Sequence, residues 1–419
     1  MSKRTVVFEA PFWSRSGYGD HARDLLKSLQ KNDTLEVKII VTGWGDCPNE
    51  KYPEFNHMLL RDGGYQPDIF IKLGTPAEFQ RKAKYNIGIT AGIETTLAPA
   101  SWIEGCNRME LVIVPSNHAR DVFLNTTYDK MDNNTRKKVG TLKCERPIEV
   151  LFEGVNTEVF HKLDKAKGLD FESNLSEIPE EFCFLYTGHW IHGDIGHDRK
   201  DVGKLIETFI ETFRNTGKSK RPALILKTSG ATFSIIEYNN IYNKLKDITK
   251  KYKHEIPNIY VIEGGATEEE MNCLYNHPKV KAMVSFTKGE GYGRPLAEFC
   301  ITQKPVIASN WSGQTDFLLH SIKLPGELKQ VHPSAANDML LKEAQWFYAD
   351  YNYASKVMKD VFKNYKKYIP DARKQARIIR EDFNLNEMTD KFKNILDSNL
   401  PKFAKKINFN IPKLEKVNG

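Results

Sequence analysis

The sequence predicts an α/β protein of two doubly wound domains, each with a parallel sheet covered by helices on both faces. The chain has 419 residues, which is more than one hydrophobic core usually supports, so two domains are expected. Short, continuously apolar runs alternate with turn and helix signals, as is typical of parallel strands buried on both faces. A polar stretch at 161–180, rich in Lys, Asp, Glu and Ser, interrupts this alternation, and we place the domain linker there.

The first half of the chain predicts five strands of a parallel sheet. An apolar run at 5–8 is followed by a glycine-containing turn, Ser16-Gly-Tyr-Gly19, and then by helical spacing from His21 to Leu29. This strand, loop and helix order is the repeating unit of a doubly wound sheet. Four further apolar runs continue the pattern, at 37–41, 68–73, 85–90 and 111–115. We therefore expect a first Rossmann-like domain over residues 1–165.

The second half repeats the pattern and predicts a second Rossmann-like domain over residues 180–335. Thr267-Glu-Glu-Glu270 matches a capping box, in which the Thr267 hydroxyl and the Glu270 carboxylate bond backbone amides at the start of a helix. The expected strands are apolar runs that are each followed by a loop and a helical segment, at 182–186, 223–227, 259–262, 282–286 and 305–308.

Residues 336–419 predict a helical, basic segment that packs back on the first domain. Its apolar residues recur at the spacing of one buried helix face. They are Val357, Met358, Val361, Phe362 and Tyr365. Such a stripe is usually core packing, so we assign it no chemistry.

The composition indicates a folded protein outside the membrane. Hydrophobic residues make up 40% and charged residues 27% of the chain, which is ordinary for a globular protein. No stretch approaches the roughly 20 apolar residues that span a bilayer, and the N-terminal apolar run is too short for a secretory signal. We expect a cytoplasmic protein with reduced cysteines, since the six cysteines form no Cys-x-x-Cys pair. The net charge of +7 fits an acidic substrate, a membrane surface or nucleic acid equally well.

One segment, Lys288-Gly-Glu-Gly-Tyr-Gly-Arg-Pro-Leu-Ala-Glu298, carries the clearest functional signal. It follows an expected strand and reaches Pro295, a residue suited to the first turn of a helix. Glu290 precedes this helix and Glu298 lies one turn inside it, so both could bond the hydroxyls of an extended ligand. The spacing alone fits a glycine turn with two solvent-facing glutamates equally well. The free amides and positive end of such a helix can hold phosphate oxygens, here at Gly291, Tyr292 and Gly293.

Two glutamates separated by seven residues around Glu-Gly-Tyr-Gly resemble the hallmark of retaining glycosyltransferases of the two-Rossmann-domain architecture called GT-B. Glycosyltransferase family 4 is the family most resembled. The resemblance implies an N-terminal acceptor domain, a C-terminal nucleotide-sugar donor domain and a cleft between them. Glu298 would bond the nucleotide ribose and Glu290 the donor sugar. Further segments fit the family between about residues 5 and 320: Ser16–Gly19, Asn107–Ser116, Val150–Asn156 with Phe160, and Lys304–Ser309.

The same resemblance implies a pair of cations that neutralises the donor diphosphate. Lys200 matches the family's lysine, in Asp198-Arg-Lys-Asp201, whereas His189 stands where an arginine is usual. Arg199 or Arg294 could take the place of that arginine. Arg199 and Lys200 also fit an ordinary solvated pair.

The first domain would complete the site. Glu94, in Ala91-Gly-Ile-Glu-Thr-Thr96, lies near where the family places a residue that touches the transferred sugar, and it fits a simple loop contact equally well. Gly17, Tyr18 and Gly19 would face the donor, although their glycines also fit a tight turn. The candidate catalytic set is Glu290, Lys200, Arg199 and Glu94.

The resemblance also implies a mechanism that retains the anomeric configuration. Amides and cations would offset the charge of the leaving diphosphate, and domain closure would exclude water. The acceptor hydroxyl would attack on the leaving group's own face, with the phosphate taking its proton. The sequence holds no Asp-x-Asp motif, so we expect no metal or other cofactor beside the nucleotide sugar. UDP is the commonest donor nucleotide in the family.

The acceptor is the least constrained part of the prediction. Gly88–Thr96 and Trp102–Arg108 look like glycosyltransferases encoded by tailed bacteriophages, some of which modify hydroxymethylated pyrimidines in their own DNA. This resemblance implies double-stranded DNA with 5-hydroxymethylcytosine as an acceptor, and the host cytoplasm as the location. Basic stretches are compatible with a phosphate backbone and, one by one, with solvated faces; they lie at 81–84, 136–138, 218–221, 363–367 and 402–406.

Three other functions stay open. A polysaccharide, lipid or protein acceptor fits the same donor site. Nucleotide-sugar epimerases share the architecture and convert the donor without an acceptor. A non-catalytic DNA-binding protein is disfavoured because a complete donor motif would then have no use. Turnover of the donor distinguishes these functions.

Overall fold

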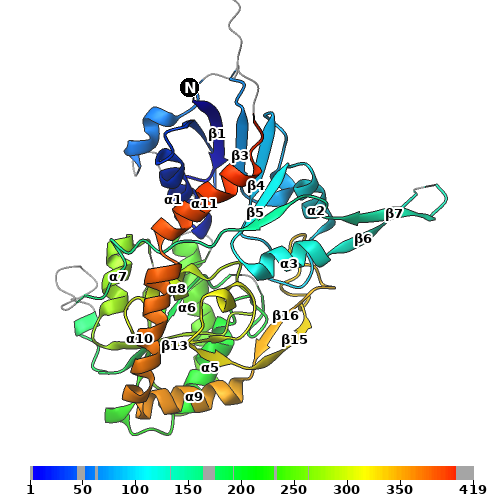
Figure 1. Cartoon of the computed structure of the whole chain (residues 1–419). Helices are drawn as coiled ribbons and strands as arrows, with labels where there is room; N and C mark the ends of the chain where they lie inside the picture. The colour runs from blue at the N-terminus through cyan, green and yellow to red at the C-terminus, as the bar shows by residue number, and fades with distance from the viewer. Residues whose placement is uncertain are drawn as a thin grey trace, which may run out of the picture.

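The computed structural model contains two α/β lobes, each built on a six-stranded parallel sheet (Figure 1). This confirms the predicted fold class. Most of the expected linker, at 164–174, and most of the last basic stretch, at 403–406, lie outside the described residues. The structure describes residues 3–44, 52–61, 65–132, 134–163, 175–191, 193–230, 234–262 and 264–402.

The N-terminal sheet has the strand order β2-β1-β3-β4-β5-β8, with all neighbours parallel. All five expected strands are present, and β8, which is only three residues long, adds an edge strand that the apolar pattern does not reveal. The strands are β1 (Arg4–Ala10), β2 (Leu35–Val41), β3 (Ile69–Leu73), β4 (Tyr85–Ile89), β5 (Leu111–Val114) and β8 (Ile148–Val150). The helices of this lobe are α1 (Gly17–Gln30), α2 (Ala100–Asn107) and α3 (Asn117–Asn125), with 3₁₀ turns η2 (Pro53–Met58) and η3 (Pro76–Glu78).

The C-terminal sheet has the order β11-β10-β9-β12-β13-β14 and is also parallel throughout. The predicted capping box is confirmed at Thr267, where both reciprocal bonds are present. The strands are β9 (Cys183–Thr187), β10 (Ala223–Lys227), β11 (Ile259–Ile262), β12 (Val280–Ser285), β13 (Val306–Ser309) and β14 (Ile322–Leu324). The helical segments are α5 (Val202–Phe213), η4 (Lys218–Lys220), α6 (Ile235–Thr249), α7 (Glu268–Asn276), α8 (Arg294–Cys300) and η5 (Gly313–Asp316).

Two antiparallel pairs lie outside these sheets. The pair β6 (Thr127–Met131) and β7 (Lys138–Lys143) forms a hairpin that projects from the N-terminal lobe (Figure 1). The pair β15 (Gly326–Gln330) and β16 (Gln345–Ala349) lies beside the C-terminal lobe. The region after 335 therefore differs from the expected helix until residue 351, because the aromatic run in β16 has high strand propensity and pairs with β15.

Three helices close the described chain: α9 (Tyr351–Lys363), α10 (Tyr365–Asp382) and α11 (Leu385–Asn399). Of the expected apolar stripe, Val357, Met358 and Val361 of α9 are buried in the core of the C-terminal lobe, and Phe362 and Tyr365 are partly buried against it. The chain then returns to the first lobe, where Val155 exchanges backbone hydrogen bonds with Phe383 and Leu385 at 2.9 Å each, and α11 contacts α1. No helix in the described ranges is long and apolar enough to cross a membrane.

Candidate active site between the two domains

A cavity of about 430 Å³ lies between the lobes, at the carboxyl ends of both sheets. The loops after β1, β4, β9 and β12 reach it, and the strand order reverses beside β1 and beside β9. Ligands of doubly wound sheets bind at such switch points. The predicted residues that line the cavity are Glu290, Lys200, Arg199, Glu94, Gly17, Tyr18, His189, Gly291, Tyr292, Gly293, Arg294 and Glu298.

The glycine loop after β12 sits directly against the N-terminal lobe. A Cβ atom added to Gly289 or Gly291 would overlap the backbone carbonyl of Glu94 or Ala91, respectively. These glycines thus let the two lobes approach each other, in addition to any room that they leave for a ligand. Within the described chain, no hydrogen bond uses the backbone amide of Gly291, Tyr292 or Gly293, so the amides that we predicted for phosphate binding have no partner there. The Tyr292 side chain packs instead in the core against Phe317.

Four of the predicted residues form one charge cluster across the cleft. Lys200 Nζ bonds Glu290, and Arg199 Nη1 lies 3.0 Å from Glu94 Oε1 and 3.7 Å from Glu290 Oε2. Their side chains are 12–21% exposed. Burial alone would raise the pKa of Glu290, but Lys200 and Arg199 outweigh it and lower the pKa below its usual value. Glu290 is therefore ionised at neutral pH, and Arg199 and Lys200 are not the solvated pair that the sequence also allowed.

A buried ion pair holds the loops that carry this cluster. Lys288 Nζ lies 2.5 Å from Asp201 Oδ1, and both side chains are fully buried. Tyr351 donates a hydrogen bond of 2.6 Å to the same carboxylate. The backbone N–H of Lys288 also donates to the Arg199 carbonyl at 2.8 Å. The loop before α5 is thereby fixed to the glycine loop, which brings Lys200 to Glu290.

The guanidinium of Arg294 is directed at carboxylates of both lobes. Its Nη1 lies 2.7 Å from Asp24 Oδ2 of α1, its Nε lies 2.8 Å from Glu298 Oε1, and its Nη2 lies 3.5 Å from Glu268 Oε1. Since its donors are directed at three carboxylates, Arg294 joins the two lobes and orients Glu298. Of the two arginines considered for this role, Arg199 is the one whose guanidinium lies beside Glu290 and Lys200.

His189 is fixed by its own lobe. Its Nδ1 lies 2.9 Å from the Gly230 carbonyl and 3.0 Å from Ser229 Oγ. Because a carbonyl only accepts, Nδ1 carries the proton and the neutral ring offers Nε2 as an acceptor. Burial and the neighbouring Lys200 lower the pKa of His189. The neutral imidazole is therefore a poor substitute for an arginine.

The start of α1 differs from the expected loop. Ser16 is the N-cap and Gly17 begins the helix, so the predicted glycine turn forms its first turn. Gly17 and Tyr18 line the cavity. Gly19 does not, because its Cα packs against the backbone of Ser14. The positive end of α1 faces the cavity and can attract an anion.

Several residues at the cavity were not predicted. Arg15 crosses from the N-terminal lobe and covers Gly265, and Lys227 donates a hydrogen bond of 2.5 Å to the Gly264 carbonyl. Burial raises the pKa of Glu153 to about 7. Arg15 and Lys227 are single residues outside a recognisable motif, and Glu153 lies in the segment Val150–Asn156, which resembles the family but was assigned no role at the site. The carboxyl end of β10 is the one signal that could have suggested Lys227.

Glycine at position 291 is expected to control closure of the cleft. In Gly291→Ala the added methyl group overlaps the Ala91 carbonyl, so the lobes should separate, and small-angle X-ray scattering should show a larger radius of gyration. The rate of any reaction in the cleft should fall at least about tenfold, since misplaced groups lose rate steeply. Gly217→Ala is the control, because a methyl group there meets no atom within 4 Å. Equal scattering from both variants would contradict the closure role.

The contribution of Glu298 to stability is expected to fall as pH rises from about 5 to 8. Burial raises the pKa of Glu298 to about 8, against the opposing effect of Arg294. An unfolded glutamate has a pKa near 4.3, so in this window the folded state binds a proton that the unfolded state lacks. The slope is at most about 1.4 kcal/mol per pH unit for one group. Urea denaturation should show that the stability of Glu298→Gln relative to the unchanged protein rises with pH across this window, and a constant difference would contradict a neutral Glu298.

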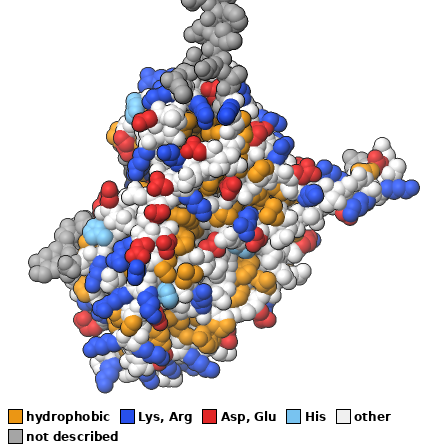
Figure 2. Space-filling view, in the orientation of Figure 1, with side chains coloured by type: hydrophobic (Ala, Val, Ile, Leu, Met, Phe, Trp, Pro, Cys, Tyr) orange, Lys and Arg blue, Asp and Glu red, His pale blue; other side chains and the backbone are white. Residues whose placement is uncertain are grey.

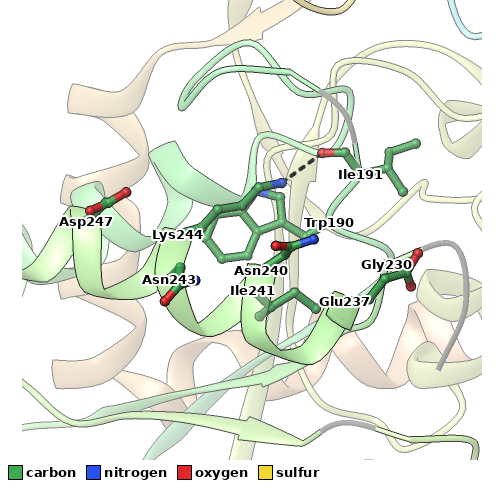
Figure 3. A pocket seen from close by; sticks show the side chains of 9 residues that line it. All are labelled: Trp190, Ile191, Gly230, Glu237, Asn240, Ile241, Asn243, Lys244 and Asp247. Atoms are coloured by element: carbon green, nitrogen blue, oxygen red, sulfur yellow. Dashed lines mark hydrogen bonds between the residues drawn. The ribbon is translucent and has the colours of Figure 1, made fainter. Parts of the chain in front are cut away.

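A second recess lies on the C-terminal lobe (Figure 3). Its volume is about 380 Å³, and it is lined by Trp190 and the side chains of α6. Lys244 lies over the Trp190 ring at 5.3 Å from its centroid and donates to the Ile191 carbonyl at 3.2 Å. The recess contains none of the predicted donor-site residues, so we place the candidate site in the interdomain cavity. Among the described residues no group of three or more His, Cys, Asp or Glu is arranged to hold a metal ion.

The two facing Rossmann-like lobes and the cavity between them define the GT-B architecture. Sucrose-phosphate synthase from Thermosynechococcus elongatus has a TM-score of 0.63 at 12% identity, covering 94% of this chain and 99% of that one. Anabaena HepE in complex with UDP-glucose has a TM-score of 0.61 at 11% identity, covering 94% and 100%. A glycosyltransferase from Rickettsia africae has a TM-score of 0.59 at 14% identity, covering 96% and 100%. No protein-family model and no curated protein sequence matches the chain.

Proposed function

We propose that this protein is a glycosyltransferase that moves a sugar from a nucleotide diphosphate sugar to an acceptor hydroxyl. One observation carries the proposal: the cavity gathers Glu290 and Glu298 with Arg199 and Lys200 at the carboxyl ends of both sheets. Cations suit a diphosphate, and carboxyl groups suit the hydroxyls of ribose and sugar. UDP is the proposed nucleotide, which is consistent with the complex of the structural neighbour HepE with UDP-glucose.

In the proposed reaction the bond between the anomeric carbon and the diphosphate breaks while the acceptor oxygen bonds the same carbon. Arg199, Lys200 and the positive end of α1 offset the charge of the leaving diphosphate. Glu290, kept ionised by Lys200, orients the donor sugar, and neutral Glu298 can both donate to and accept from the ribose hydroxyls. Retention of the anomeric configuration, with the acceptor proton passing to the leaving phosphate, is proposed from the resemblance to family 4.

The proposed acceptor is the hydroxymethyl group of 5-hydroxymethylcytosine in double-stranded DNA. The segments Gly88–Thr96 and Trp102–Arg108 support this acceptor by their resemblance to phage enzymes, and the net charge of +7 is compatible with a polyanion. Glu94 and Ala91 form part of the wall of the cavity on the N-terminal side, which is where the acceptor would enter.

The test is incubation with UDP-sugars and DNA that contains 5-hydroxymethylcytosine, followed by mass spectrometry of the bases and assay of released UDP. A gain of one sugar mass on the modified base, with equal release of UDP, is expected. Transfer only to a polysaccharide, lipid or protein would support the glycosyltransferase activity but show that DNA is not the acceptor. Conversion of the donor to an epimer, or DNA binding without any turnover, would overturn the transferase itself. DNA with unmodified cytosine is the control.

A further inference from the structure

The β6–β7 hairpin has no role in the donor site and little role in the core. Its root is anchored, because Tyr128 donates to the Ala98 carbonyl at 2.6 Å and Leu142 is buried beside α2 and α3. Beyond this root the strands leave the body of the protein (Figure 1). At about 3.3 Å per residue, five to six residues per strand extend for roughly 17–20 Å. An exposed two-stranded ribbon of this kind gains little stability by itself.

The hairpin is strongly basic along its length. Two acidic side chains lie on it, and both have partners: Asp129 pairs with Lys138 at 2.5 Å, and Asp132 accepts three hydrogen bonds from the turn. Blue side chains mark the projecting arm in Figure 2. In the described part of the chain no carboxylate pairs with the four remaining cations, which are Lys130, Arg136, Lys137 and Lys143. All four are exposed.

The other basic stretches are arranged differently. In the stretch 81–84, Arg81, Lys82 and Lys84 each pair with a carboxylate of the same lobe. The basic residues of α9 and α10 lie on the surface of the C-terminal lobe rather than on an arm (Figure 2). Among the basic stretches within the described residues, the hairpin is the one that combines several unpaired cations with a narrow, projecting shape. Met131 and Val139 add exposed apolar groups beside these cations, at 49% and 67% exposure.

We propose that the β6–β7 hairpin binds the major groove and flanking phosphates of duplex DNA. This inference rests on DNA being the acceptor, as proposed above. The major groove of B-form DNA admits a two-stranded ribbon, and its phosphates attract the four cations. The exposed apolar groups fit the methyl groups of thymine. Helix α3 joins the arm to the cleft, since Ala119 at its start packs against Gly92 of the cavity loop and its end leads into β6. Nine helical residues span about 13 Å.

The experiment compares two quadruple variants of the full chain by fluorescence anisotropy with a labelled duplex. The arm variant is Lys130→Gln, Arg136→Asn, Lys137→Gln and Lys143→Gln, with asparagine at 136 because that residue has a left-handed backbone, φ 56°. The control variant removes the same charge from α9 and α10, by Lys363→Gln, Lys366→Gln, Arg373→Gln and Arg380→Gln. Equal thermal midpoints would show that each variant is folded.

The arm variant is expected to bind duplex DNA at least tenfold more weakly than the control variant. The slope of log affinity against log salt concentration should be smaller in magnitude by about 2–4, because each lost phosphate contact contributes about 0.9 to that slope. Replacing the three lysines of the arm with arginine should preserve DNA binding. The affinity of the arm variant for UDP should equal that of the wild type. If DNA affinity fell equally in both variants, or in neither, the proposal that the hairpin binds DNA would be wrong. If the wild type glycosylates DNA while the arm variant does so equally well, only this inference fails; if the wild type neither binds nor modifies DNA, the proposed acceptor fails with it.

Discussion

Replacing Glu290 with alanine is expected to slow sugar transfer by about a hundredfold, without weakening UDP binding. Glu290 is paired with Lys200 and lies near Arg199. Without this carboxylate, Lys200 faces the cavity uncompensated, while Arg199 keeps its pair with Glu94, so the cavity attracts a diphosphate at least as strongly as before. The donor sugar, however, loses the group that orients it, and losses of this kind cost on the order of 10²-fold in rate. Single-turnover transfer and calorimetric titration of UDP measure the two effects separately.

Glu298→Ala should show the opposite pattern, with weaker nucleotide binding and a smaller change in the rate of the bound complex. Glu298 lies one turn inside α8, where Arg294 orients it, away from the cluster of Glu290. Glu290→Gln retains the shape of the side chain and controls for misfolding, and Glu327→Ala removes a carboxylate that is 68% exposed. If Glu290→Ala and Glu298→Ala altered rate and affinity alike, their assignment to sugar and ribose would be wrong.

The parts of the fold that the sequence predicts well are those in which one local pattern decides the structure. Ten strands could be located because a parallel strand covered on both faces must be apolar at nearly every position. The edge strand β8 contains Glu149 and lacks this pattern. The hairpin strands β6 and β7 are mostly exposed, so burial imposes no pattern on them. The strand β16 was missed because aromatic residues also fit the expected helix.

The candidate site was predictable where its residues share one segment. Glu290 and Glu298 are carried by a single loop and helix, so the resemblance of this one segment to the family motif was enough to suggest their places in a donor site. Asp24, Arg15 and Lys227 meet the site only through the tertiary fold, and no local pattern marks them. The glycines at 289 and 291 show a further limit, since sequence cannot tell whether missing side chains make room for a phosphate or for the other lobe.

Replacing Lys288 with methionine is expected to lower the free energy of unfolding by about 3–5 kcal/mol. Lys288 and Asp201 form an ion pair in which both side chains are fully buried. Removing one partner leaves an uncompensated buried charge, which destabilises the folded state more than replacing both partners does. The Asp201 carboxylate would retain the hydrogen bond from Tyr351, which does not neutralise it. Urea denaturation followed by circular dichroism measures the loss.

Two further variants separate the buried charge from the lost packing of the lysine side chain. Lys288→Met with Asp201→Asn removes both charges and should recover a large part of the stability, since asparagine tolerates the left-handed backbone of position 201, φ 55°. Lys329→Met breaks an exposed pair with Glu327 and should cost less than about 1 kcal/mol. Because this ion pair fixes Lys200 beside Glu290, Lys288→Met should also weaken UDP binding in the protein that remains folded. A loss below 1 kcal/mol in Lys288→Met would show that the pair does not hold the two site loops together.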